Sequence, residues 1–300
     1  QVGGNQLSDK ETRRPAGFFN VSTPSNDAAY CLELAELGNP LFRLSRVFAG
    51  EQQDLLTAVH AFFASIQIIG SSLQEEEVAR HKIRWWQNEC MPENLAVSNH
   101  PVLREIERLR GGVDCHEQMQ AILAGAGRRL ESIPPSDEAS FSALCREVGA
   151  SLVDMEMCLG GFSLGLQSDM DDLVLRRGLW SLICESFGPK GRGRTWWLPM
   201  SLMARAGLSR EELASNPSAP TSKAVYTNVI KYANNNSYYI DISNINQDVT
   251  NLIVLDMLVS KRLDLLSKKA PARYPATVRK TGFSDLLTAW SAARKVNRQR

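Results

Sequence analysis

The sequence lacks the features that mark membrane-spanning, disulfide-stapled and zinc-binding proteins. No apolar run reaches the roughly 18 residues that a membrane-spanning helix needs, because Gln67, Glu156 and Glu185 interrupt the longest candidates. None of the six cysteines forms a CxxC pair, and the four histidines are equally scattered. This usage argues against a zinc site and against a disulfide framework. We therefore predict a protein of a reducing compartment with no transmembrane segment and no cysteine-based metal site.

Strand patterns are also scarce, because β-branched residues never alternate with polar residues over a long stretch. Apolar residues instead recur at helical spacing, as at positions 55, 59, 62, 66 and 69. The segment 136–161 opens on a Ser-Asp cap signal and ends in Gly-Gly, as a long helix would. Three hundred residues are enough for one large domain. The sequence therefore predicts a single all-α domain of about eight to ten helices.

Positive charge is concentrated at the C-terminal end of the chain. Residues 260–300 contain eleven Lys and Arg against Asp264 and Asp285, a net charge of +9, whereas the whole chain carries only +1. The remaining residues are therefore acidic, with a net charge of −8. A basic end on an acidic body favours an anionic partner such as RNA, an acidic protein or lipid headgroups. A solvated terminal helix explains the pattern equally well.

These patterns divide the chain into three parts. Residues 1–26 are polar, show little apolar periodicity and do not resemble a secretory signal, so we expect an extended N-terminal arm. Residues 27–270 carry the helical patterns and form the predicted domain. Residues 271–300 form a basic C-terminal extension, whose last four cations are Arg294, Lys295, Arg298 and Arg300.

Several segments resemble the squalene/phytoene synthase family, a branch of the trans-isoprenyl diphosphate synthases. The resemblance spans about residues 28–270 and rests on the order and spacing of its motifs. The segments that carry it are AAYCLELAELG, IRWWQNEC, HPVLREI, ALCREVGASL, RTWWLPMSLMARAGLSREEL and NNNSYYIDI. It implies an isoprenoid synthase-like helical bundle around a deep, apolar central cavity, which agrees with the helical periodicity.

The family's reaction depends on two aspartate-rich motifs on facing helices. Carboxylates four residues apart lie on one helix face, where they hold Mg²⁺ ions that bridge to the substrate diphosphate. The metals neutralise the departing diphosphate, and the apolar cavity shields the allylic cation from water. A chain without these carboxylates has no ligands for the ions.

The first motif has lost its acids in HAFFASIQIIGSS. The resemblance places the family's Tyr and Arg on His60 and Ala64, and its three Asp on Gln67, Ile68 and Ser71. His60, Ala64, Gln67 and Ser71 keep the spacing of one inward helix face. None of these side chains can hold Mg²⁺ with a negative charge.

The second motif falls near Ser186 and Lys190, where Glu185 is the single acid between residues 179 and 194. Lys190, Arg192 and Arg194 make the following glycine-rich segment cationic. It could hold a phosphate of RNA or lipid, or form a solvated surface loop. We interpret the nearby acids Asp169, Asp171 and Asp172 as helix-capping residues.

One further departure lies in GAGRRLE, where the family has an Asp-Leu pair. In this chain Arg129-Leu130 stands at that position. Arg128 and Arg129 could lie on the surface or contact a diphosphate. Because no metal is expected, we predict that both lie on the surface.

The sequence therefore predicts a pseudoenzyme that binds no metal or other cofactor. Degenerate proteins of this type include a mitochondrial assembly factor for respiratory complex I and assembly factors of mitochondrial ribosomes. The resemblance thus implies a structural assembly factor in the mitochondrial matrix, first for the large ribosomal subunit and second for complex I. It also implies a homodimer or a heterodimer with a related chain, and the basic C-terminus suggests rRNA contact through Arg294, Lys295, Arg298 and Arg300.

Two alternatives remain open. The first is an active prenyl diphosphate transferase with rewired metal ligands, such as Glu156, Asp169 and Glu185. The second is a lipid-binding module that has kept the cavity without the chemistry.

Overall fold

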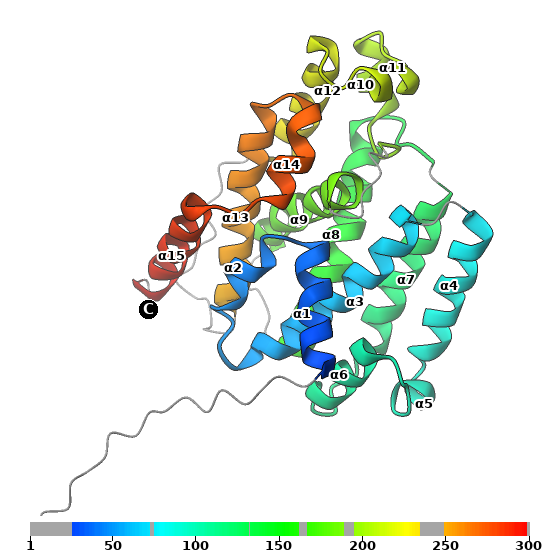
Figure 1. The fold of residues 1–300 in the computed structure, drawn as a ribbon, viewed down its shortest axis with the longest axis vertical. Coiled ribbons are helices and arrows are strands. Elements are labelled where there is room, and N and C mark those ends of the chain that lie inside the picture. Colours follow the sequence, from blue (N-terminus) through cyan, green and yellow to red (C-terminus); the bar gives the residue numbers. More distant parts are fainter. Residues whose placement is uncertain are drawn as a thin grey trace, which may run out of the picture.

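The computed structural model describes residues 26–72, 75–131, 133–161, 167–188, 195–234 and 249–298. These residues form fifteen α-helices and two short 3-10 helices (Figure 1). Ten of the α-helices have nine or more residues, which agrees with the predicted eight to ten. The predicted all-α class is confirmed. The helices are α1 (Asn26–Gly38), α2 (Phe42–Arg46), α3 (Gln53–Ser72), α4 (Glu76–Glu89), α5 (Pro92–Leu95), α6 (Pro101–Leu109), α7 (His116–Leu130), α8 (Glu138–Gly160), α9 (Gln167–Phe187), α10 (Met200–Arg205), α11 (Arg210–Ser215), α12 (Pro220–Asn234), α13 (Thr250–Ser267), α14 (Tyr274–Arg279) and α15 (Phe283–Arg298).

Helix α3 lies in the interior of the bundle, between α1, α6, α7, α8 and α9 (Figure 1). Its predicted apolar stripe is buried along its whole length, at Leu55, Val59, Phe62, Ile66 and Ile69. Apolar residues at this spacing lie on one helix face and bury a continuous stripe, which stabilises the helix through tertiary packing. Core packing therefore fixes the position of helix α3, which should carry the first motif.

Helices α8 and α9 are the longest and pack directly against each other. Asp137 caps α8, accepting a hydrogen bond from the Ser140 backbone N–H while the Ser140 side chain caps the Asp137 N–H. This reciprocal arrangement satisfies backbone donors that a helix start leaves free. Gly161 ends α8 in the left-handed region, with a φ of 67°, a conformation that glycine adopts without steric penalty.

Residues 271–298 pack onto the helical body rather than away from it. Tyr274 and Val278 of α14 belong to the main apolar core, as do Ala289, Ala292 and Ala293 of α15. Arg262 of α13 binds Asp285 of α15 through a buried ion pair of 2.7 Å. The predicted basic extension is thus anchored by both apolar and ionic contacts.

The six cysteines are all free thiols, and five of them are buried. Within the ranges given above, no helix combines the length and the apolar character needed to cross a bilayer.

Candidate functional site

Three residues of the predicted inward face of α3 contact three different helices. His60 contacts α8, through Glu156. Ala64 faces α1, where a Cβ added to Gly38 would overlap the Ala64 side chain. Gln67 donates a long hydrogen bond of 3.4 Å to the Ser181 carbonyl of α9. All three side chains are buried, as expected for an inward face. Their partners lie on three different helices, so the three residues do not form one site.

The other two positions of this motif contribute no acid. Ile68 is half-buried. Ser71 lies in the last turn of α3, and its side chain is outside the described part of the structure.

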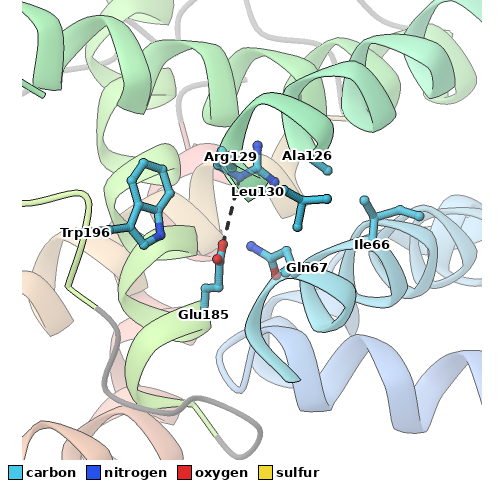
Figure 2. Close-up of a pocket in the computed structure, with 8 residues that line it drawn as sticks. Ile66, Gln67, Ala126, Arg129, Leu130, Glu185 and Trp196 are labelled. Atoms are coloured by element: carbon cyan, nitrogen blue, oxygen red, sulfur yellow. Dashed lines mark ion pairs between the residues drawn. The ribbon is translucent and has the colours of Figure 1, made fainter. Parts of the chain in front are cut away.

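Gln67 and Glu185 line a small pocket between α3, α7 and α9 (Figure 2). Ile66 and Gly70 of α3, Ala126 and Leu130 of α7, and Trp196 complete its wall. The volume of this pocket is about 20 Å³. A single water needs about 10–15 Å³, whereas pockets for small-molecule ligands measure about 300–1,000 Å³. The space at the expected metal position therefore fits one water and no diphosphate.

Arg129 of α7 closes this pocket by pairing with Glu185, with 4.0 Å between Nε and Oε2 (Figure 2). The Arg129 side chain is only 9% exposed and that of Glu185 only 12%. Burial lowers the pKa of Arg129 from its ordinary value, and Glu185 opposes this effect. The prediction that Arg129 lies on the surface is wrong, because its guanidinium supplies the charge that the buried carboxylate requires. Its neighbour Arg128 is exposed and pairs with Glu147, as predicted for a surface residue.

The donor groups of this pocket do not fit a magnesium ion. Mg²⁺ requires hard oxygen ligands in octahedral geometry. The pocket offers one carboxylate, which a guanidinium already neutralises, and one amide. Across the described ranges, no three His, Cys, Asp or Glu residues lie close enough together to hold a metal ion.

A second polar cluster lies in the core, between α3, α8 and α9. Nε2 of His60 lies 2.6 Å from Oε1 of Glu156, and Nη2 of Arg177 donates to both oxygens of Glu156, at 2.6 and 2.9 Å. Phe42 stacks on the His60 ring, with 4.0 Å between ring centroids. Burial lowers the pKa of His60 below its ordinary value despite the opposing effect of Glu156. Burial also raises the pKa of Glu156, but Arg177 and then His60 outweigh it, so the net pKa is lowered.

These pKa shifts indicate a neutral His60 and an ionised Glu156. His60 then donates a hydrogen bond to the carboxylate, and Arg177 balances its negative charge. A buried carboxylate paired in this way is a structural element of the core. Glu156 is therefore not free to serve as a rewired metal ligand. The side chain of Asp169, the second such candidate, lies outside the described residues.

The described residues at the second motif position make structural contacts. The Ser186 hydroxyl accepts a hydrogen bond of 2.7 Å from Trp197 Nε1 and donates one of 2.9 Å to the Leu182 carbonyl. Arg279 of α14 donates to the Gly188 carbonyl, at 2.8 Å, and so fixes the end of α9. The cations Lys190, Arg192 and Arg194 lie outside the described residues.

The predicted C-terminal cations lie on α15. Arg294 and Arg298 are exposed and Lys295 is half-buried, while Arg300 lies outside the described residues. The guanidinium of Arg294 lies over the Trp290 ring, 4.5 Å from its centroid.

The comparisons with known proteins agree with this fold. The sequence matches the squalene/phytoene synthase family over residues 38–237. A comparison with curated proteins gave no match. Among solved structures, the fold is similar to that of a dehydrosqualene synthase crystallised in complex with ligand, with a TM-score of 0.69 and 15% sequence identity. The similarity covers 91% of this chain and 97% of the other, and the predicted isoprenoid synthase-like fold is confirmed.

Proposed function

Because the chain belongs to the squalene/phytoene synthase family, we propose that it keeps the fold of the trans-isoprenyl synthases and has lost their reaction. The observation that carries this proposal is the ion pair between Arg129 and Glu185. It places a fixed cation beside the single acid at the second motif, in a pocket of about 20 Å³. The carboxylates that would hold Mg²⁺ at the first motif are replaced by Gln67, Ile68 and Ser71.

We further propose that the protein is a structural assembly factor of the mitochondrial matrix. The large subunit of the mitochondrial ribosome is the first candidate partner, and an intermediate of respiratory complex I is the second. The basic end of the chain, with a net charge of +9 over residues 260–300, supports a partner that carries negative charge, including rRNA. A homodimer or a heterodimer with a related chain is part of the same proposal.

An assay with prenyl diphosphates tests the loss of activity. We expect purified protein with Mg²⁺ and farnesyl or geranylgeranyl diphosphate to release no more pyrophosphate than a heat-inactivated sample. The reason is that a carboxylate paired with Arg129 and a buried amide cannot replace two aspartate-rich motifs. Mg²⁺-dependent pyrophosphate release would support the alternative of an active transferase with rewired ligands.

Affinity purification from intact mitochondria tests the assembly role. We expect precursor proteins of the large ribosomal subunit to copurify in stoichiometric amounts, and to dissociate with rising salt because charge contributes to the contact. Recovery of complex I subunits instead would select the second candidate. Recovery of neither would contradict the assembly role, whatever the pyrophosphate assay shows.

The lipid-binding alternative is a separate proposal for the same fold. The small volume between Gln67 and Glu185 argues against a prenyl chain at that position. Native mass spectrometry of the purified protein checks this point, and a retained isoprenoid would favour the lipid-binding role.

A further inference from the structure

A row of large apolar side chains is exposed on the outer face of α15. Phe283 is 74% exposed, Leu286 47%, Leu287 50% and Trp290 52%. Their spacing of i, i+3, i+4 and i+7 places them on one helix face. The opposite face carries Ala289, Ala292 and Ala293 and packs on the body of the protein. Single exposed apolar residues are ordinary, but a contiguous group of this size marks an interaction surface.

The charges around this row are cationic. Helix α15 has one acid, Asp285, which is buried in the ion pair with Arg262. Its exposed cations are Arg294 and Arg298, and Lys280 is exposed in the segment before it. Arg294 lies against the Trp290 ring and thus borders the apolar row directly. The outer face of α15 therefore combines exposed Phe, Leu and Trp side chains with positive charge, and the helix itself (residues 283–298) contributes no exposed carboxylate.

We infer that the outer face of α15 binds the surface of a lipid bilayer that contains anionic phospholipids. Side chains such as Phe283, Leu287 and Trp290 suit the boundary between headgroups and acyl chains, and flanking cations attract the negative leaflet. The helix is already folded against α13, so binding requires no ordering of the backbone. Figure 1 shows α15 at the periphery of the molecule, beside the C-terminus, where an extended surface can reach it.

This inference goes beyond the proposed function and does not depend on it. RNA would neutralise Arg294 and Arg298, and its bases could stack on Trp290, but it would leave the aliphatic side chains of Leu286 and Leu287 in water. A bilayer accommodates both the apolar row and the cations, and its negative surface charge matches a helix α15 with no exposed acid.

Vesicle cosedimentation with the full chain tests the inference. We expect binding to vesicles of 70% phosphatidylcholine and 30% phosphatidylserine to be at least about tenfold stronger than to pure phosphatidylcholine. Acyl-brominated phosphatidylcholine in the charged vesicles should quench the tryptophan fluorescence. The variant Trp290→Phe should lose most of this quenching while it still binds, because Trp290 is the tryptophan placed at the lipid.

Two pairs of matched variants localise the contact. Leu287→Glu should weaken binding by about tenfold or more, whereas Val97→Glu should not, because Val97 is 75% exposed in a turn after α5, outside α15. Arg298→Glu should also weaken binding, whereas Lys223→Glu on α12, which makes the same charge change at an exposed position, should have a smaller effect. All four positions are exposed, so circular dichroism should show folded proteins.

Several results would overturn the inference. These are the absence of binding to charged vesicles, equal binding by Leu287→Glu and Val97→Glu, or a dimer that Leu287→Glu dissociates. Binding of a single-stranded RNA probe that Arg298→Glu abolishes, together with no vesicle binding, would assign this face to nucleic acid instead.

Discussion

Replacing Glu156 with glutamine should destabilise the protein by about 3–5 kcal/mol, the range typical of breaking a buried ion pair from one side. The substitution keeps the side-chain volume and an oxygen that can accept from His60. It removes the charge that balances Arg177, whose side chain is only 2% exposed. Because Nη1 of Arg177 already lacks a hydrogen-bond partner, the guanidinium would have little else to stabilise its charge. Urea unfolding at pH 7 measures the loss.

Glu147→Gln on the same helix is the matched control. Glu147 pairs with Arg128 at the surface, and exposed pairs contribute about 0–1 kcal/mol. The double variant Glu156→Gln/Arg177→Met removes both buried charges and should recover about 2 kcal/mol or more relative to Glu156→Gln alone. Equal stability of Glu156→Gln and Glu147→Gln would show that the ion pair is not a structural element of the core.

The helical architecture could be predicted from the sequence because it depends on local periodicity. The stripe from Leu55 to Ile69 on α3 repeats at 3–4 residues, and each of its members is buried. The cap at Asp137 and the glycine stop at Gly161 likewise lie within a few residues of the helix ends that they define. Such local patterns can be recognised without knowing which residues pack against the helix.

The polar contacts at the site could not be predicted in this way. His60 and Glu156 are 96 residues apart, and no spacing in the chain indicates that they meet. Arg128 and Arg129 differ by about 100° around α7, so they face different directions. The sequence nevertheless did not indicate that Arg129 is buried, and the prediction that both lie on the surface failed for that residue. The loss of acids at Gln67 and Ile68 was visible in the sequence, whereas the ion pair of Arg129 with Glu185 required the structure.

Replacing Gly178 with alanine should be at least as damaging as any side-chain change in the core, because it forces two backbones apart. A Cβ added to Gly178 of α9 would overlap the carbonyl oxygen of Cys145 on α8, and one added to Gly149 of α8 would overlap that of Val174 on α9. The two helices thus approach most closely where each carries a glycine. Overpacking a well-packed core usually costs about 1–3 kcal/mol because side chains can adjust, but here the obstacle is backbone.

We therefore expect Gly178→Ala and Gly149→Ala each to destabilise the protein by more than about 3 kcal/mol, or to prevent folding. Gly127→Ala on α7 is the control, because nothing lies within 4 Å of its added Cβ. A glycine inside a helix is about 0.5–1 kcal/mol less favourable than alanine, so this variant should be slightly more stable than the wild type. Thermal unfolding of the three variants measures these opposite signs. Since α9 also carries Arg177 and Glu185, separating it from α8 should weaken the polar contacts of both residues. If the Gly178→Ala protein were as stable as Gly127→Ala, α8 and α9 would not pack at this distance.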